Sequence, residues 1–196
     1  MTKPSIGIIG GTGKLGQAFA KHLGKRGYDV ATCGRSTEST PEQLAAQADI
    51  VIVCVPIGNT IEMIERIAPH LRPQTVLCDF TSIKAEPLVA MLAAHTGPVV
   101  GLHPVFGPEN LLPGQTIVVC PGRDSNAKDR IKAIFADFQL IEMDAAEHDR
   151  AMALVQGLQH FVETAFAATT ARSQIPLQSL LAVSSPVYRV QLDLVG

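Results

Sequence analysis

The sequence predicts an α/β fold, in which a doubly wound, mainly parallel sheet is followed by an incomplete α-helical C-terminal domain. Three observations support this class. Short apolar runs alternate, along the first part of the chain, with segments whose apolar residues recur at helical spacing. The run IVIVCVPI at residues 50–57 is continuously apolar, which is typical of a parallel strand covered on both faces. From residue 145 onward, one long helical pattern replaces the short elements.

The alternation of strands and helices indicates a parallel sheet with helices packed against it. We expect strands at residues 5–10, 28–33, 50–57, 75–78, 98–102 and 116–120. We expect helices from the first glycine turn to Gly27 and at residues 60–67, 83–94, 126–138 and 145–170. The change of pattern near Asp144 predicts two domains, at residues 1–144 and 145–196.

Composition limits the kinds of partner. The chain has 196 residues, enough for one domain and a small second one. Its net charge of −2 gives no basic field for nucleic acid or a membrane surface, so we expect a small molecule or a protein as partner. We find no signal peptide and no apolar run of membrane-spanning length, and expect a cytoplasmic protein. The cysteines have no metal-binding spacing, so we expect no metal.

The turn GGTGKLG contains the pattern GxGxxG at Gly11, Gly13 and Gly16. It follows a predicted strand and opens a helix, where glycines permit a tight turn and the close approach of a pyrophosphate. The sequence therefore predicts a Rossmann-like dinucleotide site; glycines that only form a tight turn are the alternative. Gly10, Gly13 and Gly16 also fit the GxxGxxG of NADP-binding short-chain reductases, but neither tyrosine precedes a lysine by four residues, as those reductases commonly require.

The end of the second predicted strand indicates which dinucleotide is bound. NAD-binding domains usually carry an Asp or Glu there, which bonds the ribose hydroxyls of the adenosine. This chain has Gly34 at that place, followed by Arg35, Ser36 and Thr37, which provide a cation and two hydroxyls. We therefore expect NADP in preference to NAD. The alternative is that Arg35 is an ordinary surface arginine and that Glu38 or another group binds the ribose.

Ligands of an open α/β sheet bind beyond the carboxyl ends of its strands. Three such ends carry the segments CVPIGNT (54–60), DFTSIK (79–84) and LHPVFGP (102–108), and we expect all three to face one crevice. The expected contacts with the dinucleotide are Gly11, Thr12, Gly13, Lys14, Leu15, Gly16, Gly34, Arg35, Ser36, Val55, Pro56 and Thr81.

The segments GGTGKLG, ADIVIVCVPI, DFTSIKAEPL, GLHPVFGP, EHD ahead of QGLQHF, and LLAVSSPVYRVQL follow one another along nearly the whole chain. In this order they resemble the prephenate dehydrogenase family, whose members oxidise and decarboxylate prephenate or arogenate on the route to tyrosine. The resemblance implies hydride transfer from the ring carbinol carbon to a nicotinamide, with loss of CO2. It also implies a cyclohexadienyl substrate and a homodimer formed through C-terminal helices.

The resemblance implies roles for individual residues. His103 would accept a hydrogen bond and then a proton from the ring hydroxyl, while Ser82 would bond that hydroxyl and orient the imidazole. His160 and Gln156, on one face of the long helix, would line the substrate pocket, and Arg189 would lie near the substrate carboxylates. A neutral imidazole with a pKa near 6.5 suits a base that relieves the charge built up by hydride departure. Arginines suit the two carboxylates.

Simpler alternatives stay open. His103 could be a loop histidine bonded to backbone, Ser82 the N-cap of the helix at 83–94, and His160 part of a solvated face. The chain could also be another NADP-dependent reductase of the Rossmann class, or a non-catalytic NADP-binding module; turnover of prephenate or arogenate with NADP discriminates among these. The sequence leaves open the choice among prephenate, arogenate and an amino-substituted analogue, as well as feedback by tyrosine.

The C-terminal part is shorter than the family pattern, which continues to another substrate-binding arginine beyond Gly196. A last helix, with Ser185 as N-cap and Pro186 at its first position, ends in the apolar residues Val190, Leu192, Leu194 and Val195. We expect an apparently truncated domain that self-associates through this surface. An expressed fragment, a proteolytic fragment and a natural short form are the possible origins.

Overall fold

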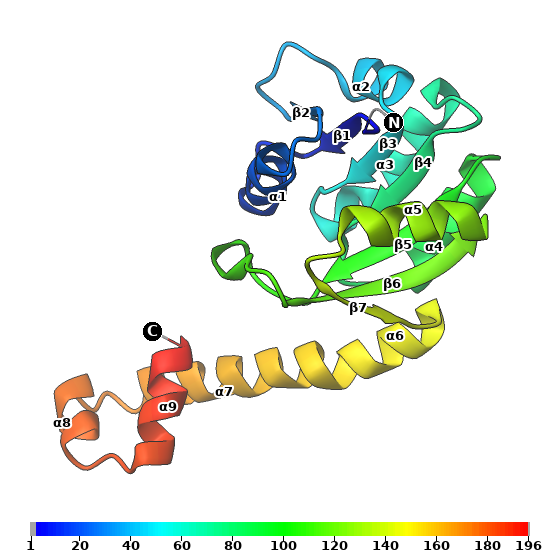
Figure 1. The fold of residues 1–196 in the computed structure, drawn as a ribbon. Helices are drawn as coiled ribbons and strands as arrows, with labels where there is room; N and C mark the ends of the chain where they lie inside the picture. Colours follow the sequence, from blue (N-terminus) through cyan, green and yellow to red (C-terminus); the bar gives the residue numbers. More distant parts are fainter. Residues whose placement is uncertain (1–2, 196) are drawn as a thin grey trace. The chain divides into compact units, whose positions relative to one another are not determined.

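The computed structural model describes residues 3–195, with the backbone alone for Asn110 and residues 191–195. It confirms the expected fold class. Strands and helices alternate along the first part of the chain, and helices alone make up the last part (Figure 1). Within the described residues, no helix has both the length and the apolar character that crossing a bilayer requires.

The chain forms two compact units, which divide between Asp149 and Arg150. The sequence pattern had placed the boundary five residues earlier, at Asp144. His148 and Asp149 belong to the first unit because their side chains bond to His103 and Lys84 of that unit.

The first unit is built on a seven-stranded sheet in the order β2-β1-β3-β4-β5-β6-β7. Its strands are β1 (Ile6–Ile9), β2 (Val30–Cys33), β3 (Ile50–Val53), β4 (Val76–Asp79), β5 (Val99–Pro104), β6 (Thr116–Arg123) and β7 (Gln139–Glu142). Neighbouring strands are parallel, apart from the antiparallel pair β5 and β6. The carboxyl ends of the first five strands therefore meet at one edge of the sheet.

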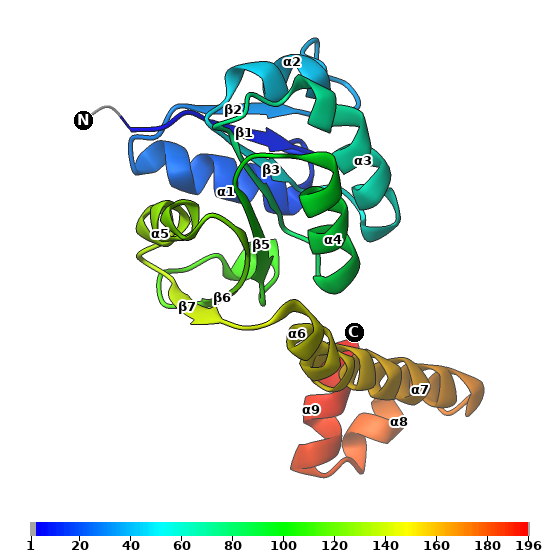
Figure 2. The same cartoon turned by 90° about the vertical axis from the view of Figure 1, so that its right-hand side faces the viewer.

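Helices cover both faces of this sheet. They are α1 (Lys14–Lys25), α2 (Pro41–Gln47), α3 (Thr60–Ile67), α4 (Ala85–Ala94) and α5 (Ser125–Ile134). Figure 2 shows α1 and α5 on one side of the sheet and α3 and α4 on the other. Phe19 and Ile131 pack into the core under α1 and α5, whereas Leu44, Ile64 and Met91 pack into the core under α2, α3 and α4. Every residue of β1, β3, β4 and β5 is buried, as the continuous apolar runs predict.

Two elements of this unit were not expected from the sequence. α2 begins with a capping box in which the Thr40 hydroxyl accepts from the Gln43 backbone and the Gln43 side chain accepts from the Thr40 backbone. Pro41 occupies the first turn, so the sequence TPEQ did contain a helix start signal. β7 is an edge strand with mostly exposed side chains, and it therefore lacks a distinctive apolar run.

A continuous helix leads into the second unit. α6 (Ala145–Met152) passes without a break through a π-helical segment, Ala153–Leu158, into α7 (Gln159–Arg172). Two further helices follow, α8 (Leu177–Ala182) and α9 (Pro186–Val195). Ser185 caps α9 as expected, because its hydroxyl accepts a hydrogen bond from the Tyr188 amide at 3.2 Å.

The second unit exposes most of its apolar surface. None of the side chains described between Arg150 and Val190 is buried. Phe161 is 70% exposed and Val190 is 57% exposed. The apolar residues Val155, Leu158 and Val162 of the long helix are exposed as well. The side chains of the expected apolar end at Leu192, Leu194 and Val195 lie outside the described residues.

The turn after β1 depends on a glycine. Gly10 has φ +85°, and a Cβ atom there would overlap the Cys54 carbonyl; Gly114 has φ +87°, with nothing within 4 Å of such an atom. We expect Gly114→Ala to lower the free energy of unfolding by about 1 kcal/mol from backbone strain alone, and Gly10→Ala by about 3 kcal/mol. Urea denaturation measures both values. Equal losses in the two variants would show that the contact with Cys54 is unimportant.

Candidate active site

A cleft of about 710 Å³ opens beyond the carboxyl ends of β1, β2 and β3. Among the expected dinucleotide contacts, its lining contains Thr12, Gly13, Gly34, Arg35, Val55 and Pro56. The other expected contacts are not among the described residues that line the cleft: Gly11, Lys14, Leu15, Gly16, Ser36 and Thr81. The structure thus brings together the glycine turn, the end of β2 and the segment after β3.

The glycine turn fits a pyrophosphate. A Cβ atom at Gly16 would lie 2.7 Å from the Gly10 carbonyl oxygen and from the Gly11 Cα, so any side chain there would push α1 away from the turn. Gly13 is the N-cap of α1 and offers no side chain to the first amides of the helix. The first amides of an α-helix have no intrahelical acceptor, and an anion bound at this turn would satisfy them.

The end of β2 has no room for a carboxylate. A Cβ atom at Gly34 would overlap the Thr12 hydroxyl, so a larger residue would displace Thr12. The Thr37 hydroxyl instead closes this turn, lying 3.0 Å from both the amide and the carbonyl of Gly34. Arg35 and Arg66 line the cleft, and the described lining contains no Asp or Glu. Arg66 comes from α3 and was missed by the sequence analysis.

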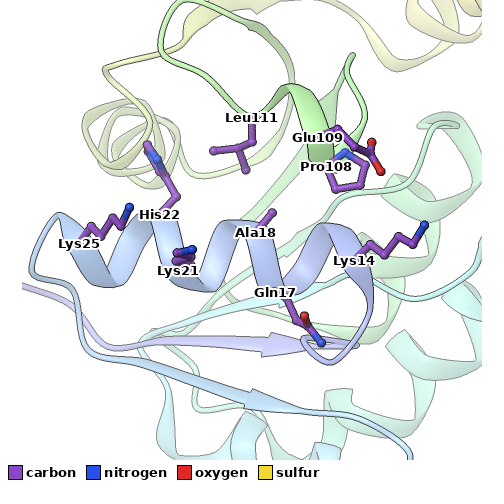
Figure 3. Close-up of a pocket in the computed structure, with 9 residues that line it drawn as sticks. All are labelled: Lys14, Gln17, Ala18, Lys21, His22, Lys25, Pro108, Glu109 and Leu111. Carbon is purple, nitrogen blue, oxygen red and sulfur yellow. The ribbon is translucent and has the colours of Figure 1, made fainter.

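A second hollow of about 530 Å³ lies between α1 and the segment after β5 (Figure 3). Lys14, Lys21 and Lys25 line it from α1, and Pro108 and Glu109 line it from the other wall. The three lysines have no ion pair among the described residues. Their positive charge favours anions along this side of α1.

A chain of three side chains lies at the carboxyl end of β5. His103 is paired in register with Val118 and only 2% exposed, so it belongs to the strand rather than to the loop after it. Its Nδ1 lies 2.8 Å from Nε2 of His148, and Nδ1 of His148 lies 2.8 Å from Oδ1 of Asp149. His148 and Asp149 belong to the EHD motif, yet the sequence analysis gave them no role.

Asp149 also holds the N-terminus of α4. Its carboxylate accepts hydrogen bonds from the backbone amides of Lys84, at 2.7 Å, and Ala85, at 2.9 Å. Partial burial would raise the pKa of Asp149, but the hydrogen bonds from the Ala85 amide, from His148 and from the Lys84 amide lower it below its usual value. The carboxylate is therefore charged at neutral pH.

This charge determines the tautomers along the chain. A carboxylate only accepts hydrogen bonds, so Nδ1 of His148 donates to Asp149. In a neutral His148, Nε2 must then accept, and the donor is Nδ1 of His103. The lone pair of His103 is consequently on Nε2, the nitrogen that would act as a base.

Burial keeps His103 neutral. It lowers the pKa of His103 to about 3, with further lowering by His148 and Lys84 and partial compensation by Asp149. The value near 6.5 expected for an exposed imidazole is thus wrong for this buried histidine. The imidazole is unprotonated throughout the physiological range and can accept a proton.

A fully buried ion pair supports the strand that carries His103. Lys84 donates to the Asp79 carboxylate and, at 2.8 Å, to the carbonyl oxygen of Leu102. Burial lowers the pKa of Lys84, and the charge of Asp79 opposes that effect. Because Leu102 precedes His103, this lysine links the carboxyl ends of β4 and β5 next to the histidine in the chain. Sequence reasoning did not single it out.

Ser82 lies in the same region but makes no described hydrogen bond. It is not the N-cap of the helix expected at 83–94, because α4 begins at Ala85 and its first amides bond to Asp149. The imidazole contact assigned to Ser82 is occupied at Nδ1 by His148. The Thr81 hydroxyl bonds within its own loop, to Asp79 and to the Ile83 carbonyl.

The remaining predicted substrate residues lie in the second unit. His160 is exposed, with Nδ1 3.4 Å from Glu163. Arg189 donates to the Ser184 hydroxyl at 2.9 Å and to the Leu181 carbonyl at 3.2 Å, which closes the end of α8. Gln156 is half-buried in the π-helical segment. Their role in substrate binding stays a prediction.

The doubly wound sheet, glycine turn and cleft place the protein among the dinucleotide-binding α/β proteins. Within that class, residues 19–142 match the nucleotide-binding domain of prephenate dehydrogenase, and residues 144–193 match the prephenate dehydrogenase dimerization domain. The chain therefore belongs to the prephenate dehydrogenase family, as the sequence motifs suggested.

Individual relatives agree with this assignment. The T-protein of Haemophilus influenzae is 41% identical over 197 residues, covering 97% of this chain and 52% of that protein. A probable arogenate/prephenate dehydrogenase of Methanocaldococcus jannaschii is 31% identical over 218 residues, covering 100% and 49%. The chain thus spans about half the length of these relatives.

Solved structures share the fold. Prephenate dehydrogenase from A. aeolicus, in complex with hydroxyphenyl propionate and NAD+, matches with a TM-score of 0.82 at 19% identity, covering 98% of this chain and 78% of that one. Synechocystis arogenate dehydrogenase matches with a TM-score of 0.76 at 23% identity, covering 98% and 79%.

The low pKa of His103 predicts how stability depends on pH. Below pH 6.5 the unfolded chain binds a proton at this histidine, whereas the folded chain does not until about pH 3, so stability falls as the pH drops through this window. Between pH 6.5 and pH 5, we expect the wild type to lose about 2 kcal/mol more unfolding free energy than His103→Asn. Urea denaturation at each pH measures the difference. Parallel curves would contradict the shift.

Proposed function

We propose that this chain provides the dinucleotide site and the catalytic base of an NADP-dependent dehydrogenase that oxidises and decarboxylates prephenate or arogenate. The observation that carries the proposal is the hydrogen-bonded chain His103, His148 and Asp149, at the carboxyl edge of a dinucleotide-binding sheet in a member of this family. Residues 1–144 would form the cofactor domain and residues 145–196 the substrate and dimerisation segment.

His103 would act as the base. Bound NADP would supply the hydride acceptor. As the C–H bond of the ring carbinol breaks, Nε2 of His103 would take the hydroxyl proton, so that the oxygen does not retain a positive charge. His148 and Asp149 would hold the ring and stabilise the imidazolium that forms. Release of the ring carboxylate as CO2 leaves its electron pair in the ring, which becomes aromatic, and the ring oxygen takes the proton back from Nε2 of His103. Aromatisation drives the step forward.

Other residues of this chain would bind the substrate. Ser82 would bond the reacting hydroxyl, His160 and Gln156 would line the pocket, and Arg189 would lie near the carboxylates. Arg189 currently donates to uncharged oxygens of Ser184 and Leu181, which a carboxylate would outcompete as an acceptor.

Replacing the base tests the mechanism. We expect His103→Asn to lower kcat with prephenate or arogenate by about 10² to 10⁴ while the Kd for NADPH stays within about twofold. The matched control is His70→Asn, at an exposed histidine of the turn Ala68–His70, which should keep full activity. Steady-state kinetics and fluorescence titration provide the two readouts. A fall in kcat of less than tenfold would refute the role of His103.

NADP is the proposed cofactor because the end of β2 carries an arginine and no carboxylate. Gly34 excludes a carboxylate there, and Arg35 lines the cleft beside it. A carboxylate at this place would bind the ribose hydroxyls of NAD and repel a 2′-phosphate, whereas an arginine favours the phosphate. The A. aeolicus enzyme was solved with NAD+, so the preference is proposed for this chain alone.

Cofactor kinetics test this preference. We expect kcat/KM for NADP to exceed that for NAD by at least about tenfold, and Arg35→Ala to reduce the ratio about tenfold, as the loss of one charge-assisted hydrogen bond would do. Lys132→Ala, at a lysine of α5 that pairs with Glu142, is the control and should leave the ratio unchanged. A tenfold preference of the wild type for NAD would reverse the assignment.

We also propose that the protein is a homodimer through its C-terminal helices. The matched dimerization domain and the exposed apolar side chains of α7, such as Phe161 and Val162, support this. We expect Phe161→Glu to shift the protein toward the monomer in sedimentation velocity, with Thr164→Glu, at another exposed position of α7, as control. A monomeric wild type at micromolar concentration would contradict the proposal.

A further inference from the structure

Arg66 occupies a place in the dinucleotide cleft that the sequence motifs did not indicate. It lies in the last turn of α3, and its Nε donates to Oε1 of Glu42 at 2.5 Å, across from the first turn of α2. The cleft is lined both by Arg66 and by Cys33 and Gly34 at the end of β2. Two helices thus hold a guanidinium at the adenosine end of the cleft.

The charges around this end are unbalanced. Arg35 and Arg66 line the cleft, and no carboxylate appears among the described lining residues. Glu42 does not line the cleft; the hydrogen bond from Arg66 lowers its pKa to about 2, so it stays ionised. Glu42 engages only Nε, and no other hydrogen bond of Arg66 is described. The terminal amino groups of Arg66 can therefore donate to a ligand.

We propose that Arg66 is a specificity-determining residue that binds the 2′-phosphate of the adenosine ribose opposite Arg35, and that Glu42 is the residue that positions it. The inference rests on the proposed use of NADP. A phosphomonoester has several acceptor oxygens, so two guanidinium groups from different elements can bind it together. The neighbouring hydroxyls of Thr37, Ser39 and Thr40 line the same end of the cleft.

Glu42 holds the Arg66 side chain in place beside the cleft. An arginine side chain has several rotatable bonds, and ordering it on binding costs free energy. The bond from Nε to Glu42 fixes the guanidinium before the ligand arrives. Glu42 is not among the residues that line the cleft, so its carboxylate need not face the phosphate.

Two fragments of the cofactor isolate the 2′-phosphate. We would measure the Kd of 2′,5′-ADP and of 5′-AMP by calorimetry on the complete chain, because the two differ only in that phosphate and need no turnover. The wild type is expected to bind 2′,5′-ADP at least about tenfold more tightly. Arg66→Ala should weaken 2′,5′-ADP about tenfold and leave 5′-AMP within about twofold.

Two further variants serve as comparisons for Arg66→Ala: Arg66→Gln, which is the more conservative change, and Arg130→Ala, which is the control for lost charge. Arg66→Gln keeps most of the side-chain length, and the Arg66 side chain is 51% exposed, so folding should tolerate both changes at this position. Arg130→Ala, at an exposed arginine of α5 outside the cleft lining, removes the same charge and should leave both Kd values unchanged.

The positioning role of Glu42 has its own comparison. Glu42→Gln and Glu42→Ala both remove the negative charge, but only the glutamine carbonyl can accept the bond from Nε of Arg66. We expect Glu42→Gln to keep the preference for 2′,5′-ADP and Glu42→Ala to reduce it at least about threefold, as a positioned guanidinium requires. Equal preferences in these two variants would overturn the positioning role.

The binding results can refute the role of Arg66 and the use of NADP separately. Equal binding of the two fragments by the wild type would refute the use of NADP, and the inference with it. A wild type that prefers 2′,5′-ADP, together with Arg66→Ala and Arg66→Gln that keep this preference, would overturn the role of Arg66 while NADP stands. Equal weakening of both fragments by Arg66→Ala would also overturn it, because the arginine would then bind a part of the nucleotide that NAD shares.

Discussion

The Asp149 carboxylate is the group on which the geometry of the catalytic region depends. It accepts hydrogen bonds from the first amides of α4 and from Nδ1 of His148. Helix amides without an intrahelical partner need a hydrogen-bond acceptor. Two hydrogen-bonded imidazoles likewise need an acceptor at one end, because it determines which nitrogen of each ring donates. One carboxylate meets both needs, so the position of α4 and the orientation of His103 cannot be set independently.

The buried surroundings of His103 make it a weak base before any ligand binds, and the proposed substrate would reverse part of this effect. Lys84 lowers the pKa of the imidazole further, even though Asp79 pairs with this lysine. A substrate with two carboxylates would bring negative charge to the site and raise the basicity of His103 when the complex forms. In the proposed mechanism, the base is unprotonated before the substrate binds, and binding would bring its pKa nearer to the working pH.

The sequence was sufficient for the parallel strands, because β1, β3, β4 and β5 are continuously apolar, and for the glycine turn, because its spacing is local. It was also sufficient to place His103 at a strand end. His148 lies 45 residues further along and Arg66 lies on the far wall of the cleft; only the folded chain brings them to their partners. Lys84 resembles a surface residue in sequence, and its burial follows from the packing of β4 against β5.

The π-helical segment Ala153–Leu158 changes which side chains of the long helix share a face. Each residue of an α-helix advances about 100° around the axis, so the extra residue that a π turn accommodates rotates everything after it by a comparable angle. The rotation separates residues that precede Ala153 from residues that follow Leu158. Gln156 and His160 are four residues apart at the end of the segment, so they still share one face, as the sequence predicted. A wide turn of this kind lets one continuous helix direct the side chains before it and the side chains after it into different angular sectors.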